Sequence, residues 1–203
     1  MAVADTTKQL SIFAINFSVG IVPDRNACRV LVEQTLQQYL EIDKKIQLIF
    51  DDYGKPQIKG HQLAFSYSHS QTMLVIGVNP LAGAIGVDTE PSSRLNDILA
   101  LRESAFSPIE GDNLANDEYI TAWCRKEAAV KQLGKGFREA DPSEFIIKTS
   151  DKSYTLYIGS NEIQTGYFFN IVLGNDVVVV CADEPVKDFL LYCRDLKSIQ
   201  TKE

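Results

Sequence analysis

The order strand, long helix, then several strands occurs twice along this sequence, and it limits the possible folds more than any other feature. An apolar stretch at 9–17 and an amphipathic helix at about 25–41 begin the first half. A strand at 85–90 and a helix at about 115–133 begin the second half. No sequence repeat accompanies the recurring order. We therefore predict an α+β fold in which each half is a long helix packed on a mainly antiparallel sheet.

Shorter patterns predict the remaining elements. Further strands are expected at 45–50, 63–67, 73–78, 143–149, 153–159, 164–173 and 176–182, and a further helix at about 95–105. Gly174-Asn175 is a hairpin signal between the last two strands. The polar stretch at about 184–203 is expected to be a weak helix or frayed. A boundary near Pro80 divides the chain into predicted halves of residues 1–81 and 82–203.

Composition and charge exclude several classes of protein. The chain of 203 residues has a formal net charge of −7, whereas a general nucleic-acid binder needs a basic face. No apolar run is long enough to span a bilayer and no signal peptide is readable, so we expect a cytoplasmic protein without a membrane partner. The four cysteines lack metal-type spacing and are expected to be free thiols. A local patch that can bind phosphate remains in Arg125, Lys126, Lys131, Lys135 and Arg138.

Three carboxylates are candidates for one site. Asp88 and Glu90 lie two apart on a predicted strand, so their side chains point to the same side. Glu127 and Lys131 lie four apart on a predicted helix and share a face. Each pair alone is most often a solvated surface feature. If the fold brings strand and helix together, three carboxylates converge beside an ammonium, which suits a hard divalent cation and a phosphate-bearing substrate.

The longer strings around these carboxylates are more specific. They read Gly86-Val87-Asp88-Thr89-Glu90 and Trp123-Cys124-Arg125-Lys126-Glu127-Ala128-Ala129-Val130-Lys131, with Glu127 39 positions after Asp88. Together they resemble the two signature motifs of the 4'-phosphopantetheinyl transferase superfamily, in its surfactin-synthetase-activating (Sfp-like) type. Further motifs of that family are similar to Gly54-Lys55-Pro56, Phe65-Ser66-Tyr67-Ser68-His69-Ser70 and Phe106-Ser107-Pro108 with Glu110. The resemblance extends over roughly residues 25–182.

This resemblance implies a fold and an activity. The family is a pseudo-dimer of two α/β halves with the active site between them. Its members transfer 4'-phosphopantetheine from coenzyme A to a serine of an apo carrier protein (acyl, polyketide or peptidyl) and release adenosine 3',5'-bisphosphate. We therefore expect a transferase of the holo-[acyl-carrier-protein] synthase type, with Mg²⁺ as cofactor, coenzyme A as substrate and an apo carrier protein as partner. Because both walls of the site would come from one chain, we expect a monomer.

The resemblance also implies roles for individual residues. Asp88, Glu90 and Glu127 would hold Mg²⁺ against the diphosphate of coenzyme A, and Lys131 would contact that diphosphate. Glu127 and Lys131 are thus the expected catalytic residues, and either Glu127 or a water on the metal would take the serine proton. Trp123 is expected to pack rather than react. The expected contacts to coenzyme A come from Arg25, Lys55, Ser68, His69, Lys126 and Lys131.

The N-terminal region departs from the family pattern. Members of this type often carry an extra basic segment between the first strand and the first long helix. Here the chain passes directly from Phe17 to Pro23-Asp24-Arg25. We expect Arg25 to supply one cation there, and the residues that hold the 3'-phosphate are the least determined part of the site.

Two other functions remain open. The same carboxylates could serve another Mg²⁺-dependent phosphate-ester enzyme, such as a hydrolase that acts with water. The chain could also be a catalytically silent module that binds carrier proteins. The presence of Asp88, Glu90, Glu127 and Lys131 counts against a silent module. Transfer to serine with release of adenosine 3',5'-bisphosphate would exclude a hydrolase.

Overall fold

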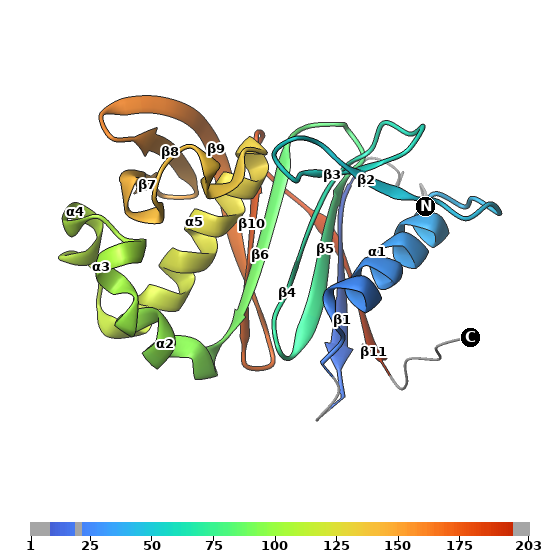
Figure 1. The fold of residues 1–203 in the computed structure, drawn as a ribbon, viewed down its shortest axis with the longest axis horizontal. Helices are drawn as coiled ribbons and strands as arrows, with labels where there is room; N and C mark the ends of the chain where they lie inside the picture. The colour runs from blue at the N-terminus through green and yellow to red at the C-terminus, as the bar shows by residue number, and fades with distance from the viewer. Residues whose placement is uncertain (1–8, 19–21, 197–203) are drawn as a thin grey trace.

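The computed structural model describes residues 9–18 and 22–196, and it confirms the predicted α+β class (Figure 1). Most strands belong to two sheets, with the orders β11-β1-β5-β4 and β6-β10-β9-β8-β7, and β2 and β3 form a small third sheet. The strand bounds are β1 (Leu10–Phe17), β2 (Leu48–Phe50), β3 (Pro56–Ile58), β4 (Ala64–His69), β5 (Met73–Asn79), β6 (Ile85–Pro91), β7 (Phe145–Ser150), β8 (Ser153–Ile158), β9 (Asn161–Leu173), β10 (Asp176–Ala182) and β11 (Phe189–Leu196).

Two long helices accompany the two large sheets. They are α1 (Arg25–Tyr39) and α5 (Tyr119–Leu133), and α5 follows three shorter helices: α2 (Leu95–Ala100), α3 (Arg102–Ala105) and α4 (Pro108–Gly111). Single 3-10 turns occur at η2 (Ser92–Arg94), η3 (Asn116–Glu118), η4 (Gly136–Arg138) and η5 (Pro142–Glu144). Across residues 9–18 and 22–196, no helix is long and apolar enough to cross a membrane.

Helix α1 forms where the sequence predicts it. Asp24 caps its N-terminus, since the Asp24 carboxylate accepts a hydrogen bond from Ala27 N at 2.8 Å. Its apolar face carries Val32 and Leu36, which join a buried cluster with Ile76 of β5. In Figure 1, α1 accordingly lies against the first sheet, on the side away from the second sheet.

Helix α5 packs closely on β6 because of one glycine. A Cβ added at Gly86 would lie 1.9 Å from Ala128 O and 2.5 Å from Gln132 N, so a larger residue would force the helix away. The helix ends at Gly134, whose φ of 84° is in the left-handed region that glycine adopts without strain. The residues of β6 that share a face with Gly86 therefore point toward α5.

The two large sheets pack on one another through an apolar cluster. Ile12 and Val75 of the first sheet lie in this cluster with Val87 and Val180 of the second sheet. The strands β4 and β6 also adjoin, because Val87 N donates a hydrogen bond to Ser66 Oγ at 3.1 Å. The layers therefore follow the order α1, first sheet, second sheet, α5, and the strands that carry the predicted site residues lie at the centre of the molecule (Figure 1).

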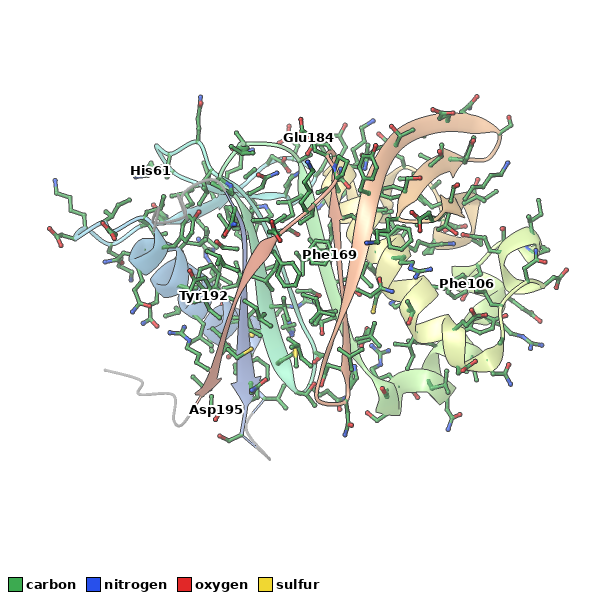
Figure 2. The ribbon with its side chains drawn as sticks, turned by 180° about the vertical axis from the view of Figure 1, so that it is seen from behind. His61, Phe106, Phe169, Glu184, Tyr192 and Asp195 are labelled. Carbon is green, nitrogen blue, oxygen red and sulfur yellow. The ribbon has the colours of Figure 1, made fainter. Side chains whose placement is uncertain are left out.

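The last strand joins the first sheet, far from its neighbours in the sequence. Strand β11 pairs in parallel with β1, and its Phe189 stacks on Phe169 of β9 with the ring centroids 4.9 Å apart (Figure 2). Residues 189–196 thus complete the first sheet, and the expected weak helix or frayed tail is wrong for them. The division into halves at 1–81 and 82–203 stays a prediction. The prediction for 197–203 lies outside the described residues.

Smaller differences from the expectations concern boundaries. The helix expected at 95–105 is broken at Leu101, between α2 and α3. The strand expected at 63–67 is longer, because β4 continues to His69. All four cysteines are free thiols. Internal similarity between the two halves, the pseudo-dimer, stays a prediction.

Candidate active site

A lysine, a serine and an aspartate meet where β4, β6 and α5 adjoin. Lys131 Nζ donates to Asp88 Oδ1 at 2.6 Å and to Ser68 Oγ at 3.0 Å, and Ser68 Oγ donates to Asp88 Oδ1 at 2.7 Å. Asp88 is 4 % exposed, whereas the side chain of Lys131 is 30 % exposed. Asp88 Oδ2 is buried without a hydrogen-bond partner among the described residues. One carboxylate oxygen is therefore left for a further donor or cation.

Two more carboxylates adjoin this cluster. Burial raises the pKa of Glu127 to about 7; Lys131 opposes that rise, and the charges of Asp88 and Glu90 add to it. Burial and Asp88 also raise the pKa of Glu90, although Glu90 Oε1 accepts a hydrogen bond from Arg94 Nη1 at 2.8 Å. Burial alone would lower the pKa of Lys131, but Asp88 and Glu127 together raise it. The three predicted carboxylates are therefore close enough to repel one another beside a charged ammonium.

These carboxylates fit a hard divalent cation. In the described part of the chain, no group of three His, Cys, Asp or Glu side chains is arranged so that it could hold a metal ion, and Lys131 and Arg94 are ion-paired with Asp88 and Glu90. The cluster nevertheless offers the oxygen donors that Mg²⁺ prefers, including the partnerless Asp88 Oδ2. Burial is the main cause of the raised pKa of Glu127; the repulsion that Asp88 and Glu90 add to it is one that a bound cation would relieve.

A basic cavity of about 460 Å³ opens beside the carboxylates. Burial lowers the pKa of His69, and the nearby charges of Lys131 and Arg25 lower it further, so the imidazole is mostly neutral at pH 7. Lys131 and Ser68 contact both this cavity and Asp88, so a bound anion would lie next to the carboxylate cluster. The residues that line the cavity are Arg25, Asn26, Arg29, Phe50, Tyr67, Ser68, His69 and Lys131.

Lys55 lies in a second cavity on the other side of Lys131. This cavity has a volume of about 250 Å³, and Tyr67 and Lys131 line it as well as the basic cavity. Lys55 Nζ donates to Gln132 O at 3.1 Å, so the ammonium caps a carbonyl in the last turn of α5. A Cβ at Gly134 would lie 2.8 Å from Lys55 Cδ, so the Lys55 side chain lies directly against the glycine that ends α5. Lys55 thus has a structural contact in addition to its place in the cavity wall.

Lys126 is not at the site, which corrects its expected role as a phosphate contact. Its side chain is 1 % exposed, and its Nζ donates to Glu110 Oε2 at 2.8 Å and to Ala105 O at 2.8 Å. The physical reason is helix geometry: one position along α5 rotates a side chain by about 100°, which turns Lys126 away from the face of Glu127. Glu110 is held in turn by Ser107, so this ion pair fixes α4 against α5.

Trp123 packs against its neighbours, as expected. The Trp123 ring stacks on Phe137 with the centroids 6.0 Å apart.

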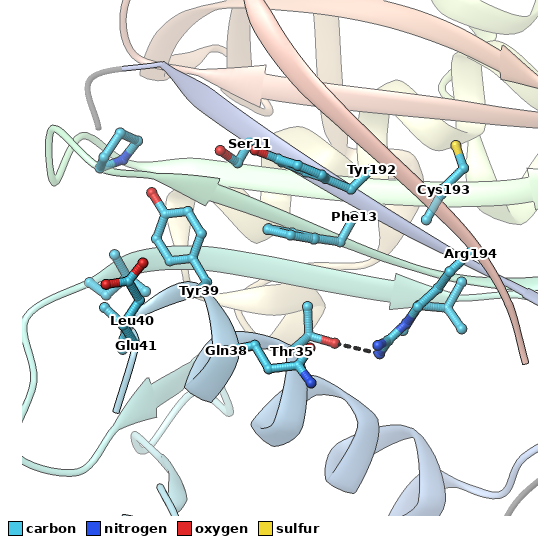
Figure 3. Close-up of a pocket in the computed structure, with 14 residues that line it drawn as sticks. Ser11, Phe13, Thr35, Gln38, Tyr39, Leu40, Glu41, Tyr192, Cys193 and Arg194 are labelled. Carbon is cyan, nitrogen blue, oxygen red and sulfur yellow. Dashed lines mark hydrogen bonds between the residues drawn. The ribbon is translucent and has the colours of Figure 1, made fainter. Parts of the chain in front are cut away.

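A cavity of about 790 Å³ lies between α1 and the strands β1 and β11, where Arg194 Nη2 donates to Thr35 Oγ1 at 2.9 Å (Figure 3). None of the predicted site residues lines it. Its size alone therefore does not mark it as the active site.

Three residues of the site were not predicted from the sequence. Arg29 lies one helical turn after Arg25 and lines the same cavity, so the four-residue spacing could have identified it. Tyr67 also lines that cavity. Arg94 pairs with Glu90 across the junction of β6 and α2, and no sequence pattern indicated that contact.

Comparison with known proteins gives a consistent result. Residues 84–182 match the sequence model of the 4'-phosphopantetheinyl transferase superfamily, and this range contains Asp88, Glu90, Glu127 and Lys131. The chain is 28 % identical over 174 residues to "4'-phosphopantetheinyl transferase Sfp" of Bacillus subtilis (strain 168), and the alignment covers 77 % of this chain and 72 % of that relative. It is 26 % identical over 174 residues to "4'-phosphopantetheinyl transferase ffp" of Bacillus subtilis, with the same coverage.

Proposed function

We propose that this chain transfers 4'-phosphopantetheine from coenzyme A to a serine of an apo carrier protein. Adenosine 3',5'-bisphosphate is the other product. The matches just described confirm its resemblance to the 4'-phosphopantetheinyl transferase superfamily, and they support this proposal. The proposal rests above all on one arrangement: the Asp88–Lys131 ion pair, at 2.6 Å, adjoins a cavity lined by cationic side chains. Carboxylates for a metal and cations for phosphates thus lie side by side, as phosphoryl transfer requires.

Lys131 is the residue that connects the two parts of the site. Its ammonium is held by Asp88 and Ser68 and also lines the basic cavity, so it can contact a diphosphate without leaving its carboxylate partner. Phosphoryl transfer spreads negative charge over the phosphoryl oxygens, and a fixed ammonium stabilises that charge in the transition state. We therefore assign Lys131 to the diphosphate and to the chemical step.

Glu127 suits the role of general base. Without metal the pKa of Glu127 is raised to about 7; a cation bound to the cluster would lower it, so that Glu127 is a carboxylate able to accept a proton at neutral pH. The serine oxygen then forms a bond to phosphorus, the bridging P–O bond of the diphosphate breaks, and the serine proton passes to Glu127. Mg²⁺ held by Asp88, Glu90 and Glu127 would supply positive charge to the diphosphate.

The basic cavity supplies binding rather than chemistry. Arg25 and Arg29 carry fixed positive charges, and Ser68 and His69 carry hydrogen-bond donors, so the cavity suits the phosphates on the adenosine side of coenzyme A. The cations that line this cavity, among them Lys131 of α5, provide a local attraction that the overall charge of −7 does not.

The test is transfer itself. Purified protein, coenzyme A, Mg²⁺ and candidate apo carrier proteins are incubated, and intact-mass spectrometry and chromatography detect the modified carrier and adenosine 3',5'-bisphosphate. Asp88→Ala should abolish formation of both products, and a chelator should do so reversibly. Glu162 is an exposed residue of β9, so Glu162→Ala should leave the yield of both products unchanged. Adenosine 3',5'-bisphosphate without a modified carrier would indicate a hydrolase, and neither product with any carrier class would refute the proposal.

A further inference from the structure

The turn between β4 and β5 is tightly organised, and it directly follows His69 of the basic cavity. Ser70 Oγ accepts hydrogen bonds from Thr72 N at 3.1 Å and from Met73 N at 3.2 Å, and Ser70 N donates to Met73 O at 2.9 Å. Ser70 is 8 % exposed. A serine that bonds two backbone amides of its own turn fixes the backbone on which the preceding residue sits.

A carboxylate from the other sheet completes this turn. Asp176, the first residue of β10, is 4 % exposed, and its Oδ1 accepts hydrogen bonds from Ser70 Oγ at 3.2 Å and from Thr72 Oγ1. Burying a carboxylate is costly unless donors satisfy it, and here two hydroxyl groups do so. The contact joins the two sheets at the end of β4.

The same hairpin also holds the end of β6. Asn175 O accepts hydrogen bonds from Ser92 N at 2.8 Å and from Ser92 Oγ at 2.8 Å, and Asp176 lies opposite Pro91 in the sheet. Ser92 follows Glu90 by two positions. The tip of the β9–β10 hairpin therefore contacts both the segment after His69 and the segment after Glu90.

We propose that Asp176 is a positioning residue of the transferase site: through Ser70 and Thr72 it fixes the turn that presents Ser68 and His69 to coenzyme A. This inference rests on the proposed function. Asp176 does not line the basic cavity, so it acts through the turn and not on the substrate.

The position of the contact distinguishes this role from general stabilisation. The sheets are already joined by their shared apolar cluster and by the bond between Val87 N and Ser66 Oγ at 3.1 Å. Asp176 adds its two hydrogen bonds only at the strand ends, next to Ser68 and His69. Its removal should therefore loosen the coenzyme A contacts more than it weakens the fold.

The variants separate these effects. Asp176→Ala removes the acceptor, Asp176→Asn keeps an oxygen in its place, and Thr72→Val removes one donor with little change of shape. Asp183→Ala is the matched control, because Asp183 follows the other end of β10, where its Oδ2 accepts from Ala84 N at 3.1 Å. For each variant we would measure the KM for coenzyme A and kcat with a carrier protein. The Kd of adenosine 3',5'-bisphosphate would be measured by calorimetry.

We expect Asp176→Ala to raise the KM for coenzyme A and the Kd of the bisphosphate by about five- to tenfold, with kcat within about threefold of the parent. Asp176→Asn should restore most of the affinity. Thr72→Val should also raise the KM and the Kd. In the double variant with Asp176→Ala it should raise them by less than it does in the parent, because Asp176→Ala has already removed the hydrogen bond between the two residues. If Asp176→Ala does not fold, Thr72→Val and Asp176→Asn still decide the question.

Other results would overturn the inference. Unchanged KM and Kd in Asp176→Ala, or an equal loss of affinity in Asp183→Ala, would mean that the hairpin contact serves only the fold. If the parent protein transfers no phosphopantetheine at all, the proposed function fails; if the parent transfers it and the variants keep their affinity for both ligands, only the inference about Asp176 fails.

Discussion

Replacing Glu127 with glutamine should stabilise the protein in the absence of metal while removing its activity. The pKa of Glu127 is raised from 4.5 to about 7, so the folded protein resists ionisation of this side chain more than the unfolded chain does. Each pKa unit corresponds to about 1.4 kcal/mol, which sets an upper bound of about 3 kcal/mol at pH 8. Allowing for partial solvent screening, we expect Glu127→Gln to raise the free energy of unfolding by about 2 kcal/mol at pH 8.

The sign of the pH dependence follows from the direction of the shift. Because the folded pKa lies above the unfolded value, the folded state binds more protons between pH 4.5 and 7, and this contribution to stability is lost as the pH rises through 7. At pH 4 the side chain is neutral in both states, so variant and parent should have nearly equal stability. The difference should appear between pH 5 and pH 8.

Urea unfolding in the presence of a chelator, at several pH values, measures this effect. Glu162→Gln, on the exposed part of β9, is the control and should stay within about 0.5 kcal/mol of the parent. Adding Mg²⁺ at pH 8 should then stabilise the parent more than Glu127→Gln, since the parent keeps all three carboxylates. A variant no more stable than the parent at pH 8, or a difference independent of pH, would refute the reasoning that Glu127 is strained by its neighbours.

Three further predictions separate the roles of the lysines and the histidine. Lys131→Ala should lower kcat at least tenfold and keep the preference for coenzyme A over dephospho-coenzyme A, as steady-state kinetics with both substrates would show. His69→Ala should instead raise the KM for coenzyme A about tenfold and lose much of that preference; an unchanged preference would remove His69 from the 3'-phosphate side. Lys126→Ala should destabilise the fold by about 3–5 kcal/mol, because Glu110 is left buried without its partner, and the folded fraction should keep the parent KM; a raised KM would return Lys126 to the phosphate site.

The predicted parts of the fold and site are those that local sequence determines. The 3.6-residue periodicity located α1, which in the structure follows the cap at Asp24, and the expected end of the second long helix at 133 is where Gly134 ends α5. The two-residue spacing of Asp88 and Glu90 and the four-residue spacing of Glu127 and Lys131 gave the correct faces, because helix and strand geometry fix them.

The parts that were missed depend on contacts between distant segments. Adjacent positions in the sequence fix the angle between Lys126 and Glu127 around α5, but they do not show which face of the helix other elements bury. A buried lysine is rare enough that an exposed position is the natural expectation. Its burial depends on Glu110, which reaches it only after α4 has packed on α5. The ion pair of Arg94 with Glu90 likewise depends on how the chain turns after β6.

The pairing of β11 with β1 has a consequence for the order in which the chain can fold. Leu10 lies opposite Phe189, so the first sheet, which carries Ser68 and His69, lacks one strand until residues 189–196 have been synthesised. Until then the outer edge of β1 has open backbone hydrogen-bonding groups, and such edges can pair with other chains. Bringing β1 and β11 together closes a long loop, and such long-range pairing is slow because the chain loses conformational entropy before the stabilising contacts form. A fragment that stops before Phe189 would keep every predicted site residue and still leave β1 with an open edge.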